Sequence, residues 1–464
     1  MNHPLENARP ERDDNPLPAI TEQIERSDRC VVVLDDDPTG TQTVYDTPVL
    51  TTWDLPTLTD QLRRDDRMFY VLTNSRALTQ PQAIDLARQI GANLLAASQR
   101  VGRPLTVISR SDSTLRGHYP AEVDAVATAL GHGDATRIIM PFFLQGGRLT
   151  IDDVHYVVEN DRWVPAAQTP FAKDATFGFS QSNLIDWVSE KHQGNLDRNN
   201  IHSVSLDDLR GDDLDAVSDR LLGLAPGSTV IVNAVALSDA QAFALAARKA
   251  EQRGADLIYR TAASFVQAYA GLAPRPLLAA PEMVASEHRA GLIVVGSYVP
   301  KTTAQLQHLL ATDDPPQAVQ LDVAKLLADD RGEHLRDTAD QVNALLSAGR
   351  DVVLHTSRGL VTGDDGESSL RIGTSVSQGI VDVVRNVTVP LRFLIAKGGI
   401  TSSDVATRAL ETKRARVLGQ ILPGIPVWSL GENSRAAKLP YIVFPGNVGD
   451  DDALAVAYNK LRHQ

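Results

Sequence analysis

The sequence predicts an α/β protein of two domains, each with a largely parallel sheet flanked by helices. Three observations lead to this prediction. Short apolar runs without polar alternation recur along the chain and are separated by amphipathic segments of helical length, as in βαβ units with buried strands. The length of 464 residues exceeds one ordinary core. Residues 271–289 contain three prolines and little periodicity, as domain linkers do.

The apolar runs are the expected strands. We expect a mobile tail over 1–27, which is polar and broken by prolines, and a first domain over 28–275. A linker over 276–290 and a second domain over 291–464 follow, and the turn-rich stretch 145–183 is expected to be an elaborated loop region of the first domain. The expected strands are 31–34, 69–73, 105–109, 137–140, 229–233, 292–295, 352–355, 391–396 and 441–444.

Composition narrows the class of protein. The net charge of −13 opposes binding to nucleic acid, and no basic stripe counters it. No apolar run of about 18 residues occurs, so we expect no membrane span. The first 27 residues lack the apolar core of a secretory signal. Cys30 is the single cysteine, which fits a reducing compartment. We therefore expect a cytoplasmic protein with small-molecule ligands.

The first candidate site follows strand 31–34, which leads directly into Asp35, Asp36 and Asp37 and then into Thr39 and Gly40. Ligands bind at the carboxyl ends of strands in open α/β sheets. Adjacent carboxylates repel, so one of them could keep a raised pKa and accept a proton, or the group could hold a cation or sugar hydroxyls. A solvated, capped turn explains the motif equally well.

Three further polar loops follow expected strands of the first half. The loop after 105–109 is rich in guanidinium, hydroxyl and carboxylate groups, which suit an acid that carries hydroxyls. Convergence of several such loops on one sheet edge is a stronger signal than any single loop. Lone histidines such as His118 and His155 are more often structural. The loop residues are Asn74, Ser75 and Arg76; Arg110, Ser111, Asp112, Ser113, Thr114 and Arg116; and Gly146, Gly147 and Arg148.

The second half repeats a strand, glycine and helix pattern after 292–295, 391–396 and 441–444. Glycines expose backbone N–H groups, and a helix N-terminus adds positive partial charge, so together they can bind phosphate. Lys397 is a plausible charge partner for such a phosphate, although a single Gly-Gly loop is more often a tight turn. There is no G-x-x-x-x-G-K-[ST] P-loop and no G-x-G-x-x-G dinucleotide fingerprint after a strand.

Taken together, the motifs resemble the four-carbon acid sugar kinase family from about residue 30 to the end of the chain. Several positions depart from the family pattern: Arg110 stands in place of the usual Lys, Ile400 where Glu is common, Ser403 where Gly is common, Phe444-Pro445 in place of a common Lys-Ser, and Val299 in place of a common Ser. The matching motifs are Asp36 to Gly40, Arg110 to Gly117, Gly147 to Thr150, Gly296-Ser297 with Pro300 and Thr302, Gly398 to Ser402, and Gly446 to Asp450.

The resemblance implies an N-terminal domain for an acid sugar, a C-terminal domain for a nucleotide, and an active site in the cleft between them. The expected partners are a sugar acid and ATP, and a homodimer is considered. Mg²⁺ is expected only through the ATP phosphates, with no metal held by the protein. The implied ATP contacts are Ser297, Thr302, Gly398, Gly399, Ile400, Thr401, Gly446 and Asn447.

Phosphoryl transfer depends on positioning and charge neutralisation. Asp37 or Asp112 would orient the acceptor hydroxyl and take its proton, and Lys397 would spread the charge of the γ-phosphate. Alternatives are a sensor that binds the ligands without catalysis and, with less support, a nicotinamide-dependent dehydrogenase. The expected substrate-binding residues are Asp36, Thr39, Gly40, Arg76, Arg110, Ser111, Ser113, Thr114, Arg116 and Arg148.

Overall fold

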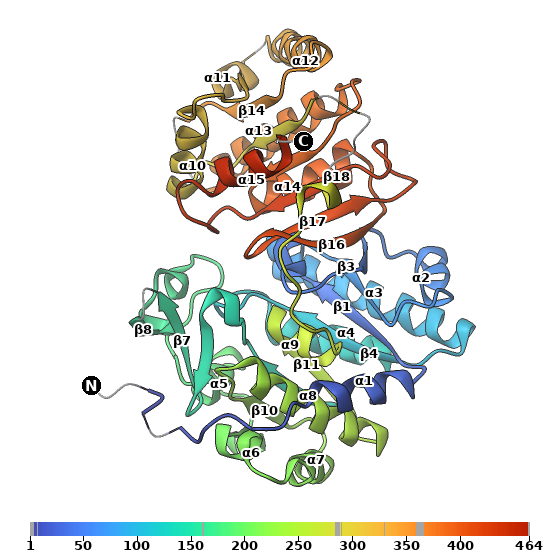
Figure 1. Ribbon diagram of the computed structural model, residues 1–464. Coiled ribbons are helices and arrows are strands. Elements are labelled where there is room, and N and C mark those ends of the chain that lie inside the picture. The colour runs from blue at the N-terminus through green and yellow to red at the C-terminus, as the bar shows by residue number, and fades with distance from the viewer. Residues whose placement is uncertain are drawn as a thin grey trace. The chain divides into compact units, whose positions relative to one another are not determined.

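The computed structural model describes residues 4–6, 8–159, 162–283, 288, 290–328, 330–358 and 366–462. The chain divides into two compact units, shown in Figure 1. Unit 1 comprises residues 1–44 and 52–274, and unit 2 comprises residues 45–51 and 275–464. Each unit contains a largely parallel sheet flanked by helices, so the predicted α/β fold class is confirmed.

The sheet of unit 1 is parallel throughout its described strands. Nearly every residue of β1, β3 and β4 is buried, which explains why these strands are recognisable as unbroken apolar runs. In spatial order the strands are β3 (Met68–Leu72), β1 (Cys30–Asp35), β4 (Leu105–Arg110), β11 (Leu257–Thr261), β5 (Thr136–Met140), β10 (Thr229–Val232) and β9 (Ile201–Val204).

Helices cover both faces of this sheet. Since side chains alternate along each strand, neighbouring residues of a strand contact helices on opposite faces. Tyr259 of β11 packs against Phe265 and Tyr269 of α9, whereas its neighbour Arg260 stacks on Trp187 of α5. The helices are α1 (Leu17–Glu25), α2 (Leu55–Leu62), α3 (Gln80–Val101), α4 (Ala121–Leu130), α5 (Leu184–Lys191), α6 (Leu206–Arg210), α7 (Leu214–Leu222), α8 (Leu237–Gln252) and α9 (Ala263–Tyr269).

A small antiparallel sheet occupies part of the stretch expected to be a loop region. It consists of β6 (Arg148–Ile151), β7 (Val154–Glu159) and β8 (Arg162–Pro165). Strand β7 alternates between buried and partly exposed residues, so one of its faces lies against the protein. The expectation of a loop was therefore wrong for these strands, which carry Arg148 at their start.

The sheet of unit 2 has a parallel part and an antiparallel part. A buried apolar cluster that includes Ile293, Phe393, Phe444, Leu454 and Tyr458 forms its core. The parallel strands, in spatial order, are β13 (Gln317–Leu321), β14 (Val352–Thr356), β12 (Leu292–Val295), β15 (Leu394–Lys397) and β18 (Pro440–Phe444). The antiparallel strands are β17 (Ile425–Leu430), β16 (Arg414–Leu422) and β2 (Thr47–Leu50). The helices are α10 (Pro300–Leu310), α11 (Val323–Leu326), α12 (Arg331–Ser347), α13 (Gly366–Arg385), α14 (Gly399–Asp404) and α15 (Ala453–Arg462).

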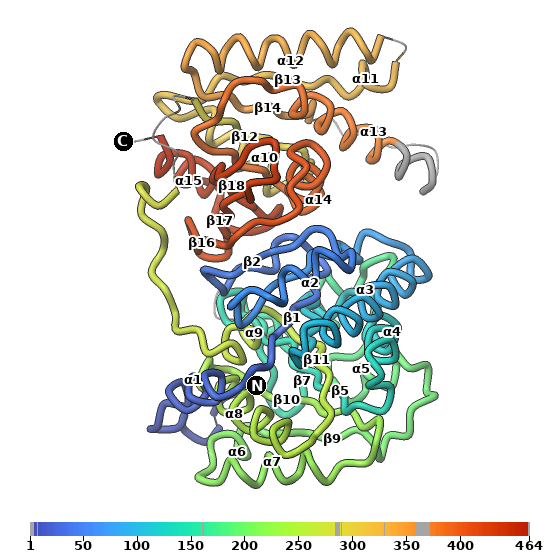
Figure 2. Tube along the Cα trace, turned by 90° about the vertical axis from the view of Figure 1, so that its right-hand side faces the viewer, coloured from blue at the N-terminus to red at the C-terminus, as the bar shows by residue number. Residues whose placement is uncertain are grey.

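Strand β2 comes from the N-terminal part of the sequence but belongs to unit 2. It pairs antiparallel with β16, with Leu50 opposite Arg414 and Thr47 opposite Val417. Figure 2 shows this blue segment beside the red β16. The expected first domain over 28–275 therefore did not anticipate that residues 45–51 belong to unit 2.

The N-terminal segment also differs from its expected mobile tail. Residues 17–25 form α1, whose Ile20 is fully buried and which contacts α8. A single buried isoleucine gives little periodic signal among prolines, so the helix was missed. Within the described residues, no helix is both long and apolar enough to span a membrane.

Candidate functional site

Two oppositely charged residues end neighbouring strands of unit 1. Asp35 is the last residue of β1 and lies beside Arg110, the last residue of β4. Arg110 Nη1 is 3.1 Å from Asp35 Oδ1 and 3.6 Å from Asp36 Oδ1. All three side chains are buried, and away from water Arg110 offsets part of the negative charge of the two carboxylates. Arg110, expected to bind substrate, is thus engaged inside the protein.

Gly40 permits the close packing of the next turn on this pair. An ideal Cβ at residue 40 would lie 2.1 Å from Asp35 Oδ1, a distance that no side chain can occupy. The short helix η1 (Pro38–Thr41) can therefore cover the carboxylate only with glycine at this position. Asp37 caps η1 by accepting a hydrogen bond from the Thr39 amide at 2.9 Å.

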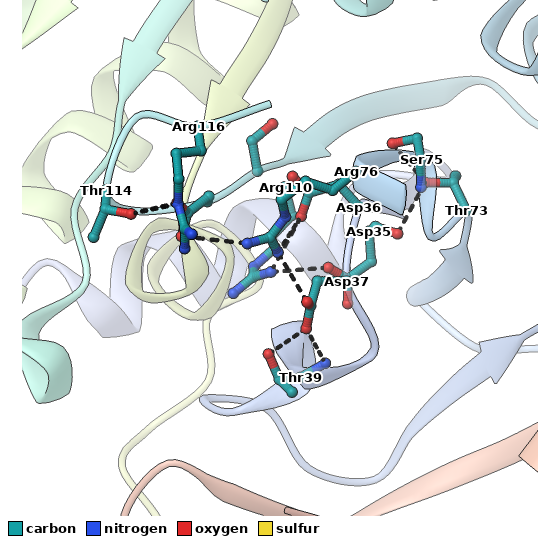
Figure 3. A network of polar contacts seen from close by, with 12 residues as sticks. Asp35, Asp36, Asp37, Thr39, Thr73, Ser75, Arg76, Arg110, Thr114 and Arg116 are labelled. Atoms are coloured by element: carbon teal, nitrogen blue, oxygen red, sulfur yellow. Dashed lines mark hydrogen bonds and ion pairs between the residues drawn. The ribbon is translucent and has the colours of Figure 1, made fainter. Parts of the chain in front are cut away.

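Arg76 connects three carboxylates from different loops. Its Nη2 is 3.1 Å from Asp36 Oδ1 and 3.2 Å from Asp37 Oδ2, and its Nη1 is 3.6 Å from Asp112 Oδ1. Figure 3 shows this network at close range. We call Asp35, Asp36, Asp37, Arg76, Arg110 and Asp112 the carboxylate–arginine cluster. It brings the loops after β1, β3 and β4 to one edge of the sheet, as the sequence predicted.

The loop after β4 holds Asp112 with several donors. Arg116 Nε lies 2.7 Å from Asp112 Oδ2, which also accepts a hydrogen bond from the Thr114 hydroxyl. Leu115, between them, has a φ of 71°, which is strained for a side chain of this size. Strained backbone is concentrated at functional sites, where the surrounding contacts hold it in place.

The carboxylates of this cluster differ in their affinity for protons. Burial raises the pKa of Asp35 to about 7 and also raises the pKa of Asp36. Burial acts in the same direction on Asp37 and Asp112, but Arg76 and several hydrogen bonds outweigh it and lower both pKa values. Asp37 and Asp112 are therefore the carboxylates held ionised at neutral pH.

Two arginines meet on one aromatic ring at the border of the cluster. The guanidinium carbons of Arg116 and Arg148 lie 5.2 Å and 5.7 Å from the centroid of Phe171. Arg116 is also 3.7 Å from Asp174, while Arg148 Nε has no hydrogen-bond partner among the described residues. Paired arginines of this kind can bind a carboxylate or other anion.

The remaining predicted residues of unit 1 have mainly structural contacts. His155 is buried between the Ser113 carbonyl, 2.8 Å from Nε2, and the Thr150 hydroxyl, 2.9 Å from Nδ1. Burial lowers the pKa of His155 to about 4, so it is neutral. His118 Nε2 lies 3.0 Å from the Leu78 carbonyl. Both histidines shape the loops, as their default interpretation anticipated.

Ser111 and Ser113, both buried, complete the loop after β4. The Ser111 amide donates to the Thr261 carbonyl at 2.8 Å, and its hydroxyl lies 3.3 Å from the Ser109 hydroxyl. These contacts fix the start of the loop on β4 and β11. That Ser111 and Ser113 contact a ligand stays a prediction.

In unit 2, the glycine loops after β12, β15 and β18 lie together, because these strands are neighbours in the sheet. Gly398 has a φ of 113°, and an ideal Cβ on it would lie 3.0 Å from Ser297 Cβ. An ideal Cβ on Gly446 would lie 3.7 Å from Ser297 Oγ. We call residues 296–299, 398–401 and 445–447 the glycine cradle. Glycine at residue 398 lets its loop approach Ser297 closely in a backbone conformation that other residues rarely adopt.

Lys397 does not take the position expected of a phosphate ligand. Its Nζ donates to the carbonyls of Pro445 at 2.5 Å and Gly446 at 3.1 Å, and the side chain is fully buried. Burial lowers the pKa of Lys397 to about 7. Thr302 likewise donates to the Gly446 carbonyl at 3.1 Å. Both residues support the cradle from inside.

The outer side of the cradle is more open. Ile400 is 61% exposed and Tyr298 is 62% exposed, and Asn447 is also exposed. Thr401 is buried, so only a few atoms of Thr401 could make the expected contact with a nucleotide. Among the described residues, no group of His, Cys, Asp and Glu side chains could hold a metal ion.

Three side chains of these sites were missed by sequence reasoning. Phe171 lies in the turn-rich stretch, and Arg260 interrupts the apolar run of β11, so neither stood out. Arg358 follows β14, an expected strand, at the same sheet edge as the cradle. The rule that loops after parallel strands carry ligands would have identified Arg358.

Comparisons with known proteins agree with this division. A family model described as a sugar-binding N-terminal domain matches residues 31–269. Another, described as a nucleotide-binding C-terminal domain, matches residues 292–454.

Two curated relatives are D-threonate kinases, from Salmonella typhimurium and Bordetella bronchiseptica. Each is 27% identical to this chain, over 398 and 405 residues respectively. The alignments cover 83% and 84% of this chain and 86% and 85% of the relatives.

Solved structures share the fold. A Haemophilus influenzae protein of family DUF1537 has a TM-score of 0.62 at 16% identity, covering 93% of this chain and 100% of its own. A Salmonella typhimurium protein has a TM-score of 0.67 at 17% identity, covering 92% of this chain and 98% of its own.

Proposed function

Because the chain belongs to the four-carbon acid sugar kinase family, we propose that it transfers the γ-phosphate of ATP to a hydroxyl of a small sugar acid. The acceptor would be a tetronate, a 3-oxo-tetronate or a related acid. The observation that carries the proposal is the carboxylate–arginine cluster at the carboxyl edge of unit 1, bordered by the two arginines on Phe171.

The cluster suits the binding of an acid that carries hydroxyls. Arg116 and Arg148 would bind the carboxylate of the acid, since Arg148 has an unpaired donor and Arg110 is engaged with Asp35. Asp37 or Asp112 would orient the acceptor hydroxyl, because an ionised carboxylate is a strong hydrogen-bond acceptor. Arg76 would keep both carboxylates ionised and in place.

In the chemical step, the acceptor oxygen would form a bond to the γ-phosphorus while the bond from that phosphorus to the β,γ-bridging oxygen breaks. The hydroxyl proton would pass to Asp37 or Asp112, and ADP would leave. Backbone amides of the glycine cradle would bind the nucleotide, with Mg²⁺ bound through its phosphates.

A coupled assay of ADP release tests this proposal. The full chain would be incubated with MgATP and, in turn, with tetronates, oxidised tetronates and branched acids of similar size. We expect ADP release that requires one class of acid. Tight binding of acids and ATP without ADP release would indicate a sensor, and reduction of a nicotinamide cofactor with an acid would indicate a dehydrogenase.

A further inference from the structure

Arg358 lies at the glycine cradle and is connected to it directly. It follows β14, the strand beside β12 in the sheet of unit 2. Its Nη2 donates to the Ser297 carbonyl at 2.6 Å and to the Thr303 hydroxyl at 2.8 Å. One edge of the guanidinium is therefore anchored on the cradle and on the first turns of α10.

The rest of this guanidinium has unused hydrogen-bonding capacity. Nε and Nη1 of Arg358 are buried and have no hydrogen-bond partner among the described residues. No carboxylate of a described residue accounts for the charge, and burial lowers the pKa of Arg358. Arg358 is partly buried, and a cation withdrawn from water without an anionic partner is costly, so its position is best explained by an anion that binds beside it.

Lys397, the charged side chain that ends β15, is not free to bind such an anion. Lys397 is turned inward and donates to two carbonyls of the cradle. His355, the nearest titratable neighbour on β14, donates from Nδ1 to the Thr356 carbonyl at 3.0 Å. Burial lowers the pKa of His355, so it adds no positive charge at neutral pH.

We propose that Arg358 binds the phosphates of the nucleotide at the glycine cradle and supplies the positive charge that the sequence had suggested for Lys397. This inference rests on the proposed function and assigns the charge partner within it. The unpaired Nε and Nη1 of Arg358 can each donate a charge-assisted hydrogen bond to a phosphate oxygen, whereas the ammonium of Lys397 is already bonded to two carbonyls.

The main alternative is that Arg358 only holds the Ser297 carbonyl. The two roles differ in what they do to neutral and charged ligands. A phosphate contact strengthens with the number of phosphates and is absent for adenosine. A purely structural contact would affect adenosine, AMP and ATP alike.

The experiment compares five forms of the full chain by calorimetric titration: wild type, Arg358→Met, Arg358→Gln, Arg358→Lys and Arg350→Met. Arg350 is an exposed arginine two residues before the same strand and serves as the matched control. The ligands are adenosine, AMP, MgATP and inorganic tripolyphosphate. Circular dichroism and thermal melting verify that each variant is folded.

We expect Arg358→Met and Arg358→Gln to raise the Kd of ATP and of tripolyphosphate by about 10- to 150-fold, as loss of a charge-assisted hydrogen bond does. Arg358→Lys should recover part of the affinity, and adenosine binding should not change. Arg350→Met should match the wild type for every ligand.

Unchanged affinity for tripolyphosphate in folded Arg358→Gln would overturn the inference, as would an equal loss for adenosine and ATP. If Arg358→Met and Arg358→Gln do not fold, Arg358→Lys, which keeps the charge, decides the question. A phosphate contact predicts that it weakens the binding of ATP more than that of AMP, and an equal loss for both would overturn the inference. A wild-type chain that binds none of the four ligands would instead refute the proposed function, and the inference with it.

Discussion

The two units present opposite kinds of site at equivalent sheet edges. In unit 1 the edge is made of side chains, and Arg76 pairs with the carboxylates of Asp36, Asp37 and Asp112 and offsets part of their negative charge. In unit 2 the edge is made of backbone, with Lys397 turned inward and Arg358 left with unpaired donors. The first arrangement suits a ligand whose hydroxyls need acceptors, and the second suits an anion.

Under the proposed function, this contrast would let the same kind of sheet edge serve two different substrates. Parallel strands bring successive loops to one edge whatever the loops contain, so the chemistry is decided by the loop residues. A site made of side chains depends on the exact geometry of its ion pairs, whereas a site made of backbone depends on how closely a ligand can approach the main chain. Each prediction below tests one side of the comparison, starting from the largest expected effect.

The first test removes a charge at the edge of unit 1. Asp37→Asn should lower kcat for the acid-dependent release of ADP by about 10²- to 10⁴-fold, the usual contribution of a positioned proton acceptor. The Kd of ATP, measured by calorimetry, should not change, because the nucleotide is assigned to unit 2. Asp85→Asn, at an exposed aspartate of α3, is the control. Wild-type turnover in Asp37→Asn would assign the proton acceptor to another residue, with Asp112 the next candidate.

The second test uses the close packing beneath that edge. Gly40→Ala would force a Cβ into the carboxylate of Asp35, so we expect a loss of about 1–3 kcal/mol in the free energy of unfolding, as overpacking produces. Urea denaturation measures this loss. Gly133→Ala is the matched control, because its nearest atom would lie 3.9 Å away. Equal stability of the two variants would show that η1 is not fitted to Asp35 as described.

The third test concerns the exposed apolar side chains of the cradle. Tyr298→Ala should raise the Kd of ATP by about 5- to 150-fold if the ring stacks on the base, since such stacking contributes about 1–3 kcal/mol. Binding of tripolyphosphate should stay the same in this variant. The control is Leu327→Ala, an apolar side chain of unit 2 that is 44% exposed. A matching loss for tripolyphosphate would place Tyr298 at the phosphates instead of the base.

The fourth test concerns a pH dependence in unit 2. The folded pKa of Lys397 is about 7, well below its ordinary value, so above pH 7 the unfolded chain binds the proton more tightly. Stability should therefore rise with pH from about 7 to about 10.5, by at most about 1.4 kcal/mol per pH unit. Lys397→Met should remove this rise, while exposed Lys325→Met should keep it. The free energy of unfolding at pH 7, 8 and 9 measures the slope, and an identical slope in Lys397→Met would contradict the assignment.

The features predictable from the sequence were those with local signals. Buried parallel strands such as β1 and β4 are unbroken apolar runs, so the strands and the loops after them could be placed. The convergence of Asp36, Arg76 and Asp112 followed from sheet topology alone. Gly398 and Gly446 were identified from the repeated pattern of strand, glycine and helix.

The features that could not be predicted depend on tertiary contacts. Strand β2 has no signal that assigns it to unit 2, because its partner β16 lies more than 350 residues later in the sequence. Strand β11 was hidden by the charge of Arg260, which is buried beside Trp187 and donates to the Arg116 carbonyl. The inward turn of Lys397 depends on two carbonyls of another loop, and no spacing in the sequence encodes it.

Phosphorus NMR of the reaction mixture tests the central claim most directly. The full chain with MgATP and an acid that supports ADP release should produce a new phosphate monoester resonance, with one ester formed for each ADP. Formation of inorganic phosphate without an ester would contradict the account, because it would mean that water, and not a sugar acid, accepts the phosphate.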